Sequence, residues 1–595
     1  MIEKKTPKEE IKLTGVPASP GIAIGTALVL GTLVDNIEKK SILFEEVEDE
    51  LNRFEEAIDI TKKQIFAIQK QVQKELNDDQ ARIFDAHLLI LDDHILINSV
   101  KEEVKKELIN VEYVFNNKIQ FYIKAISKIE DPYIRERGAD IRDVGSRVIA
   151  NLHGHDIESL KHLPGQRIIV SPDLTPSDTV SLDRENVQAF ATATGSRTSH
   201  AAIMARSMKI PAVLAIKQPI SQIKTGNIVI IDGYAGIITV NPSAKSLNFY
   251  AQKETRGGKI RENLIKESNL RPETIDGFRV QLAANIEFID DISDAKKYRA
   301  AGIGLYRTEY LYINSKELPD EEVQFNNYKD ITVKMKGSHV VIRTLDIGGD
   351  KLKDNLSLNY EDNPFLGYRA IRLSLGFPEL MKTQLRAILR ASAYGNIKIM
   401  FPMISCMEEL DKTLEILNTV KADLKKRKIP FNNDLEIGTM IETPSAALIA
   451  DKLAEKVDFF SIGTNDLVQY TLAVDRNSEK VAYLYQPSHP AILALIRNIT
   501  DVAKRNGIWV SVCGEMAGDP QYTPLLLGMG VHELSMSPVS MGLIRSIIRN
   551  TRMFEVENIA ENALECSTAK CALKLSLDYL KKIEPDIYNL SIKGE

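Results

Sequence analysis

The alternation of hydrophobic and polar positions changes character several times along this chain of 595 residues. From about residue 34, apolar residues recur at intervals of three and four, which is the spacing of one face of an amphipathic helix. The first such series comprises Phe44, Val47, Leu51, Phe54, Ile58, Ile65, Ile68, Val72 and Leu76. The same texture continues to about residue 155. We therefore predict an all-helical bundle over residues 34–155, with apolar residues that are mostly core and a face that could dock a partner.

Short apolar runs broken by turn residues flank the predicted bundle on both sides. VPASPGIAIGTALVL precedes it, and QRIIVSPDL, VQAFATAT and GNIVIIDGYAGIITV follow it. Short apolar runs bounded by Gly, Pro and Asp are typical of strands. We predict that residues 1–33 and 156–251 form one α/β domain into which the bundle is inserted.

Residues 252–271 are polar and charged, and they contain the pair Gly257-Gly258. Such a composition is typical of a linker between domains, and glycine has more backbone freedom than other residues because it lacks a Cβ. We predict a partly helical linker here, with the glycine pair as a candidate hinge.

The C-terminal part, residues 272–595, alternates strand-like and helix-like segments. Its eight apolar runs are VQLAANI, GIGLYRT, VVIRTLDI, IKIMFPM, LEIGTMIET, FFSIGTNDL, WVSVCGEM and HELSMSP. Alternating strands and helices indicate βα units around a parallel sheet, and eight such units are the number that closes a (β/α)8 barrel. An open doubly wound sheet is the alternative that the same pattern allows.

Composition narrows the class of protein rather than the fold. The chain is 44% hydrophobic and 27% charged, and its net charge of -6 favours neither nucleic acid nor an anionic membrane as a partner. No apolar run is long enough to span a membrane, and the charged N-terminus lacks the apolar core of a signal peptide. Cys406, Cys513, Cys566 and Cys571 contain no C-x-x-C pair, so we expect neither a zinc site nor a disulfide. These features predict a reduced, cytoplasmic protein.

Ionisable and amide side chains stand at the ends of most of the predicted barrel strands. They are Asn285, Arg307, Arg343, Asp346, Glu442, Asn465, Asp466, Cys513 and Glu515. The carboxyl ends of barrel strands converge on one mouth, so these side chains are expected to meet there. Arginines bind phosphate or carboxylate oxygens, and carboxylates such as Glu442 and Asp466 supply the oxygen ligands that Mg²⁺ prefers. Structural salt bridges among the same charges are the simpler alternative.

A single histidine, His200, lies in the stretch TGSRTSHAAIMAR between a polar turn and a predicted helix. It would be no more than a first-turn residue if Ser199 or Thr198 caps that helix. The functional alternative uses the same position, because a helix N-terminus attracts phosphate and disfavours a protonated imidazole. A neutral imidazole there can accept a phosphoryl group as a nucleophile, with Arg197 nearby to hold phosphoryl oxygens.

The stretch TGSRTSHAAIMAR resembles the phosphohistidine motif of the phosphoenolpyruvate-utilising enzymes. Over residues 13–575 the chain resembles the Enzyme I family of the bacterial phosphotransferase system, the phosphoenolpyruvate–protein phosphotransferases. The motifs that carry this resemblance are GVPASPGIAIG, GIGLYRTEYLY, RTLDIGGDK, NPFLGYRAIR, IGTMIETPSA, SIGTNDLVQYTLAVDR and CGEMAGD. The number and order of these motifs make the resemblance specific. A lone G-x-x-S-H motif would be too short to do so.

The resemblance implies a role for each residue that matches a family motif. Glu442 and Asp466 would bind Mg²⁺ at the barrel mouth. His200 would accept the phosphoryl group of phosphoenolpyruvate, and Cys513 would protonate the enolate so that pyruvate leaves. The substrate would be bound by Arg307, Arg343, Lys351, Arg369, Asn465 and Arg476. A cationic site of this kind suits the loose, anionic transition state of phosphoryl transfer, although Cys513, judged from its neighbours alone, would be a small buried apolar residue.

The resemblance also implies partners. In the family, the phosphohistidine passes its phosphoryl group to a histidine of the phosphocarrier protein HPr, which docks on the helical insert, in the first step of sugar uptake. The histidine domain would then visit two sites, and the linker near Gly257 would be the hinge of that motion. Because the family dimerises through its barrel, the resemblance implies a homodimer.

One turn departs from the family's pattern. The turn before the motif usually reads Gly-Gly after an acidic residue, whereas here Gly195-Ser196 follows Thr192, Ala193 and Thr194. Ser196 would be strained if its position requires a positive φ. We expect a changed rate or partner preference rather than loss of activity, because every later motif is intact.

Two other functions compete with this one. A pyruvate phosphate dikinase or phosphoenolpyruvate synthase shares the histidine unit and the barrel but needs a large nucleotide-binding domain before the histidine. Only 199 residues precede His200, and they contain no P-loop. A catalytically silent regulatory homologue would show eroded arginine and carboxylate positions, and these motifs show no such erosion.

Overall fold

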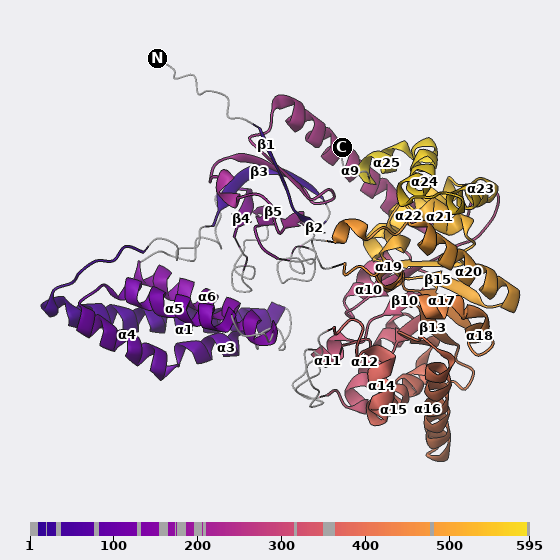
Figure 1. The fold of residues 1–595 in the computed structure, drawn as a ribbon, viewed down its shortest axis with the longest axis horizontal. Coiled ribbons are helices and arrows are strands. Elements are labelled where there is room, and N and C mark those ends of the chain that lie inside the picture. Colours follow the sequence, from indigo (N-terminus) through magenta and orange to yellow (C-terminus); the bar gives the residue numbers. More distant parts are fainter. Residues whose placement is uncertain are drawn as a thin grey trace. The chain divides into compact units, whose positions relative to one another are not determined.

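The computed structural model describes residues 10–19, 21–30, 37–75, 83–127, 132–153, 165–172, 174, 186–195, 205, 210–313, 318–348, 363–476 and 481–591. The chain divides into two compact units, one up to Gly257 and the other from Gly258 onward. The first unit holds a helical bundle and a sheet, and the second holds a closed barrel (Figure 1).

The bundle consists of α1 (Val47–Glu75), α3 (Ile83–Leu91), α4 (His94–Glu107), α5 (Val111–Ser127) and α6 (Pro132–Leu152). These helices share one core, to which Phe54 and Val148 contribute fully buried side chains. The predicted helical bundle is therefore confirmed, with one correction at its start. Phe44 lies in a 3-10 turn before α1 and is 81% exposed, because apolar spacing alone does not fix where a helix begins. Leu76, the last position of the predicted series, lies outside the described residues.

The sheet of the first unit has eight strands in the order β1-β8-β7-β3-β4-β5-β6-β2. They are β1 (Ile11–Thr14), β2 (Val16–Ser19), β3 (Ile22–Val29), β4 (Arg167–Ser171), β5 (Val187–Thr192), β6 (Ala212–Leu214), β7 (Ile228–Asp232) and β8 (Ile237–Val240). β3 precedes the bundle and runs parallel to β4, which follows it, with Thr26 opposite Arg167. Strands from both sides of the bundle thus belong to one sheet, as the sequence pattern predicted.

A long helix, α9 (Ala244–Lys266), follows β8 and runs through the division between the two units. The segment predicted as a linker, residues 252–271, is helical up to Lys266 and continues into a 3-10 turn. Gly257 and Gly258 lie inside this helix, where a glycine costs about 1 kcal/mol relative to alanine. The partly helical character agrees with the prediction, and the hinge stays a prediction.

Eight parallel strands close the barrel of the second unit in the order β10-β11-β12-β13-β14-β15-β16-β9. They are β9 (Gln281–Ile286), β10 (Ile303–Tyr306), β11 (Val340–Arg343), β12 (Ile397–Phe401), β13 (Ile437–Ile441), β14 (Phe459–Ile462), β15 (Trp509–Val512) and β16 (Glu533–Met536). The closed ring confirms the barrel and excludes the open sheet that the pattern also allowed. Buried side chains fill its interior, so the mouth stands on a packed core: Leu305, Val341, Met400, Met440, Phe459 and Cys513.

Helices follow most of these strands in the chain. They include α12 (Glu321–Lys334), α14 (Ala370–Gly376), α15 (Pro378–Ala391), α17 (Pro444–Leu448), α19 (Thr464–Leu472), α23 (Met553–Leu564) and α24 (Ala569–Ile583). They cover the strands with a second and larger core, which includes Tyr306, Leu385 and Leu467. Among the described helices, none combines the length and the apolar character that crossing a bilayer requires.

The expectation that the chain holds no disulfide is wrong. Cys566 and Cys571 are joined, with their Cα atoms 5.8 Å apart, a separation that suits a bridge. Cys566 lies in the turn between α23 and α24, and Cys571 lies in the first turn of α24, so the connection between the helices brings together two cysteines whose spacing matches no familiar pair motif. Cys406 and Cys513 are free thiols.

Candidate active site

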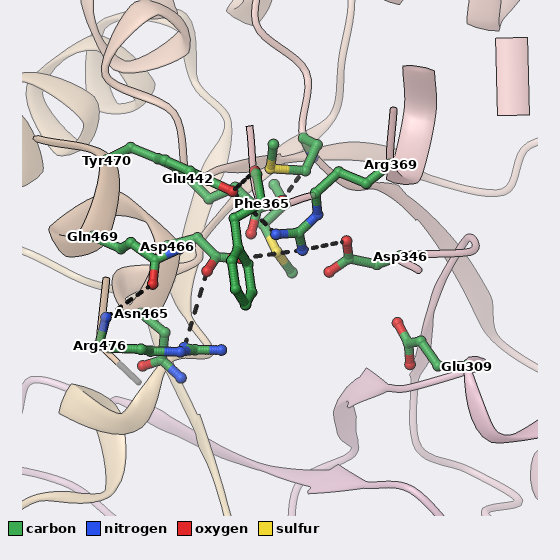
Figure 2. Close-up of polar contacts among 12 residues, drawn as sticks. Glu309, Asp346, Phe365, Arg369, Glu442, Asn465, Asp466, Gln469, Tyr470 and Arg476 are labelled. Atoms are coloured by element: carbon green, nitrogen blue, oxygen red, sulfur yellow. Dashed lines mark hydrogen bonds and ion pairs between the residues drawn. The ribbon is translucent and has the colours of Figure 1, made fainter. Parts of the chain in front are cut away.

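Three carboxylates meet at the mouth of the barrel (Figure 2). Glu442 follows β13, Asp466 lies in the first turn of α19 after β14, and Asp346 follows β11. One oxygen of each lies within 4.8 Å of the others. Oε1 of the buried Glu442 also accepts a hydrogen bond of 2.6 Å from the backbone N–H of Met403. The convergence of strand ends therefore places Glu442 and Asp466 together, as expected, and adds Asp346 to them.

Asp346 lies between two guanidinium groups. Its Oδ2 is 2.7 Å from Nη1 of Arg343, and its Oδ1 is 2.8 Å from Nη2 of Arg369. Arg343 is also paired with Glu309, which follows β10. Burial disfavours the charge on Asp346, but Arg343 and then Arg369 outweigh it and hold the pKa of this carboxyl below its usual value. Asp346 thus fixes two arginines in one orientation at the mouth.

Arg369 reaches the mouth from a loop rather than from a strand end, since it lies directly before α14. Its Nη2 is 3.6 Å from Oδ2 of Asp466, and its Nη1 donates a hydrogen bond of 3.0 Å to the hydroxyl of Tyr470. That hydroxyl donates in turn to the carbonyl of Phe365 at 2.6 Å. Tyr470 is therefore a site residue that the sequence reasoning missed. The signal that could have revealed it is its position four residues after Asp466, on the same face of α19.

The remaining arginines lie at the edge of the site. Arg476 is partly exposed, with Nη1 3.9 Å from Oδ1 of Asp466, and its backbone N–H donates to Oε1 of Gln469 at 3.3 Å. Arg307 is exposed at the end of β10, and its charge contributes to lowering the pKa of Asp346. The side chains of Arg307 and Arg476 are thus more exposed than those of Arg343 and Arg369, which are largely buried.

Two amides tie neighbouring strand ends to each other. Asn465 accepts a hydrogen bond of 2.9 Å from the backbone N–H of Glu515. Asn285 donates to the carbonyls of Cys513 and Ser535, at 2.9 and 3.2 Å. The hydrogen bonds of Asn285 thus hold neighbouring barrel strands together, while Asn465 lies beside the carboxylates (Figure 2).

The electrostatics of the mouth favour a bound cation. Burial, followed by the negative charges of Asp346 and Asp466, raises the pKa of Glu442 to about 8. Arg343 and Arg369 oppose this rise but do not cancel it, so further positive charge would be needed for Glu442 to ionise fully beside the other carboxylates. A divalent cation would supply that charge, and carboxylate oxygens are the ligands that hard divalent ions prefer. The residues present therefore fit a divalent metal.

Cys513 follows β15 and is buried in the apolar cluster of the barrel interior. Burial is the main cause that raises the pKa of its thiol to about 11. Its Sγ lies 3.7 Å from the carbonyl of Ile462. The thiol therefore stays protonated at neutral pH, which suits a proton donor and equally suits a small buried side chain.

The other predicted residues lie outside the described part of the chain. These are Ser196, Arg197, Thr198, Ser199, His200 and Lys351. In the described segment before Ser196, Thr192 ends β5, and its Oγ1 donates a hydrogen bond of 2.5 Å to the carbonyl of Thr194. Gly195 has a φ of 115°, a conformation that favours glycine.

Comparison with known proteins agrees with this architecture. Models of the PEP-utilising enzymes match the chain over residues 14–137 (N-terminal), 163–236 (mobile domain) and 261–553 (PEP-binding domain). The phosphoenolpyruvate-protein phosphotransferase of Bacillus sp. (strain S) is 46% identical over 94% of this chain and 97% of its own length. That of Bacillus subtilis (strain 168) is 45% identical over 94% of this chain and 98% of its own.

An NMR solution structure of an Enzyme I (nEIt) protein is 40% identical and covers 41% of this chain and 98% of that one, with a TM-score of 0.34. The sequence relatives carry the assignment, because their similarity covers 94% of this chain and therefore extends over both units. The chain therefore belongs to the phosphoenolpyruvate-protein phosphotransferase family of PEP-utilising enzymes.

Proposed function

We propose that this enzyme transfers the phosphoryl group of phosphoenolpyruvate to its own His200 and then to a histidine of the phosphocarrier protein HPr, with release of pyruvate. This reaction would be the first step of sugar uptake by a phosphotransferase system. One observation carries the proposal: the carboxylates Glu442 and Asp466 share a barrel mouth with Arg343 and Arg369. A silent regulatory homologue would have no reason to keep this arrangement of charges.

The metal is proposed to be Mg²⁺, held by Glu442 and Asp466. When bound, the ion supplies Lewis-acid polarisation of substrate oxygens. Asp346 differs from these two carboxylates because its two oxygens lie within hydrogen-bond distance of arginines, at 2.7 and 2.8 Å, whereas the arginine nitrogens nearest to Asp466 are 3.6 and 3.9 Å away. We therefore assign it to orienting Arg343 and Arg369 rather than to the metal.

The substrate is proposed to bind against Arg307, Arg343, Lys351, Arg369, Asn465 and Arg476. Two donors there remain available: within the described part of the chain, the buried Nε atoms of Arg343 and Arg369 have no hydrogen-bond partner. A buried donor without a partner costs free energy, and a bound anion removes that cost. Because charge builds on the phosphoryl oxygens in the transition state, fixed guanidinium groups lower the barrier as well as bind the substrate.

Cys513 is proposed to deliver the proton that converts the enolate into pyruvate. Its raised pKa keeps the thiol protonated at neutral pH, so a proton is available when the phosphoryl group leaves. The thiolate left behind would be stabilised by the positive charges of Arg343 and Arg307, which lower the pKa of this thiol against the effect of burial.

The acceptor and the protein partner follow from the family's motif and its domain plan. His200 would receive the phosphoryl group, and HPr would dock on the helical bundle, residues 34–155. That bundle presents exposed apolar side chains, which are common where proteins associate: Phe66, Leu89, Ile95 and Phe121. We also propose that residues 1–33 with 156–251 move as the histidine domain about the linker 252–271. Residues 272–595 would form the interface of a homodimer, and the location would be the cytoplasm.

Incubation with radiolabelled phosphoenolpyruvate and Mg²⁺ tests the acceptor. We expect acid-labile label on the parent and on His94→Ala, which alters an exposed histidine of the bundle, but none on His200→Ala. Label on His200→Ala would mean that another residue is the acceptor. A parent that takes up no label would contradict the proposed reaction, and a requirement for ATP would favour a dikinase.

A further inference from the structure

Arg307 and Glu309 lie in the loop after β10, Arg343 ends β11 and Asp346 lies in the loop after it, and a buried side chain joins these two segments. Thr308 is 0% exposed, and its Oγ1 donates a hydrogen bond of 3.0 Å to the carbonyl of Arg343. Thr308 lies between Arg307 and Glu309 in the chain, and its buried side chain contacts Gln384 of α15, in the layer outside the barrel. Its hydroxyl therefore fixes the first loop to the end of the second strand.

Gln384 completes this connection from behind. It belongs to α15, outside the barrel, and is 2% exposed. Its Oε1 accepts from the backbone N–H of Leu345 at 2.9 Å, and its Nε2 donates to Oγ1 of Thr308 at 3.2 Å and to the hydroxyl of Tyr328 at 3.3 Å. The N–H of Leu345 can only donate, so the amide oxygen must face it, and both donors of the amide then find hydroxyl oxygens. This side chain thus contacts the two loops at once.

We propose that Gln384 is a positioning residue for phosphoryl transfer, which holds the loops of Arg307 and Arg343 in register through Leu345 and Thr308. The inference deepens the proposed function, because it assumes that these arginines bind the substrate phosphate. The side chain of Arg307 is exposed, so its position depends mainly on the backbone of the loop. A shift of the loop would therefore move its guanidinium group directly. When a distant substitution displaces a substrate-binding group by about 1 Å, the rate can fall on the order of 10²-fold.

If Gln384 had a purely structural role, its substitution would lower the stability of the protein but would not slow phosphoryl transfer in the folded variant. Gln324 offers the matched comparison, because it is also a buried glutamine of the layer behind the barrel. Its Oε1 accepts from the hydroxyls of Tyr312 and Tyr328, and its Nε2 donates to the carbonyl of Pro319. Gln324 therefore makes the same number of hydrogen bonds as Gln384 and shares the hydroxyl of Tyr328 with it, but it bonds to neither Thr308 nor Leu345.

The test measures single-turnover phosphorylation of the full chain by radiolabelled phosphoenolpyruvate with Mg²⁺, together with kcat, KM and the thermal midpoint. Gln384→Met and Thr308→Val remove the connection with little change of volume, and Thr308→Ser keeps the hydroxyl. We expect the phosphorylation rate and kcat of the first two to fall about tenfold or more, with a smaller change in KM. Thr308→Ser should phosphorylate at close to the parent rate. Gln324→Met should lower the thermal midpoint while leaving kcat near that of the parent.

The inference is overturned if folded Gln384→Met is phosphorylated as fast as the parent, or if Gln324→Met loses as much kcat as Gln384→Met. If Gln384→Met does not fold, the pair Thr308→Val and Thr308→Ser decides, because equal rates in the two variants would contradict a role for the hydroxyl. A parent that takes no label from phosphoenolpyruvate would instead overturn the proposed function, so the two failures are distinguishable.

Discussion

Asp346 and Arg369 form an ion pair of 2.8 Å between Oδ1 and Nη2, although only Asp346 follows a barrel strand. The pair fastens the loop before α14 to the end of β11 and leaves Nε of Arg369 without a partner within the described residues. The orientation of this arginine is thus set before any substrate arrives. Preorganised charge of this kind is what a transition state that gains negative charge requires.

Asp346→Asn should therefore impair both activity and stability. The amide keeps the volume but leaves Arg343 and Arg369 without their shared counter-charge in a buried site. We expect kcat/KM to fall on the order of 10²-fold or more, and the free energy of unfolding to fall by about 3 kcal/mol. Asp411→Asn is the control, because Asp411 pairs with Lys456 at an exposed site where an ion pair contributes little. Equal effects of the two substitutions in urea unfolding would contradict the prediction.

Substitution of the proposed metal ligands should separate the metal from the fold. In Glu442→Gln and Asp466→Asn, the rise in thermal midpoint that MgCl₂ gives the parent should disappear, together with phosphorylation. Without the ion, Glu442→Gln should be at least as stable as the parent, because a neutral amide avoids both the burial of a charge and the repulsion by Asp346 and Asp466, which raise the pKa of this carboxyl. Calorimetric scans in EDTA and in MgCl₂ measure both effects, and an undiminished Mg²⁺ response in Glu442→Gln would exclude it as a ligand.

The thiol of Cys513 should react slowly with alkylating agents at pH 8. Only the thiolate is nucleophilic, and a pKa of about 11 means that the protonated form predominates until the pH approaches that value. Peptide mapping after iodoacetamide treatment should find Cys406, which is less buried, modified first, with modification of Cys513 rising as the pH rises. Cys513→Ala should slow pyruvate formation about 10²-fold or more. Modification of Cys513 at pH 8 at the rate of a free exposed thiol would contradict this account.

The bond between Cys566 and Cys571 predicts a simple difference in mass. Unfolded protein treated with iodoacetamide should gain two adducts without a reductant and four after reduction, since the chain has four cysteines. The variant that replaces both Cys566 and Cys571 by serine should gain two adducts in either case. Four adducts on the unreduced parent would show that the two thiols are not joined.

The barrel and the pairing of Glu442 with Asp466 could be predicted from sequence because both depend on short-range patterns. Apolar runs identify the strands, and the geometry of a closed parallel ring then brings their carboxyl ends together. Arg343 was predicted for the same reason. Phe44 shows the limit of such patterns, because its spacing fits the helix but its side chain lies outside it.

Other features depend on where loops travel, which periodicity does not encode. Arg369 reaches the mouth from a loop, so only its motif pointed to the site, and Tyr470 was recognised only through its hydrogen bond to that arginine. Asp346 was expected at the mouth, but its place between two guanidinium groups depends on both loops at once. The bond between Cys566 and Cys571 likewise depends on the angle at which one helix follows another.

The sheet of the first unit has a consequence for the order in which the chain can fold during synthesis. β3 pairs with β4 through Thr26 and Arg167, and β1 pairs with β8 through Ile11 and Val240. These pairs can form only after the later strand of each has left the ribosome. The inserted helices depend on contacts nearer in sequence, and such contacts form faster. We expect the helices to be folded while the first strands still have exposed edges. A chaperone that covers these edges would protect the nascent chain from aggregation.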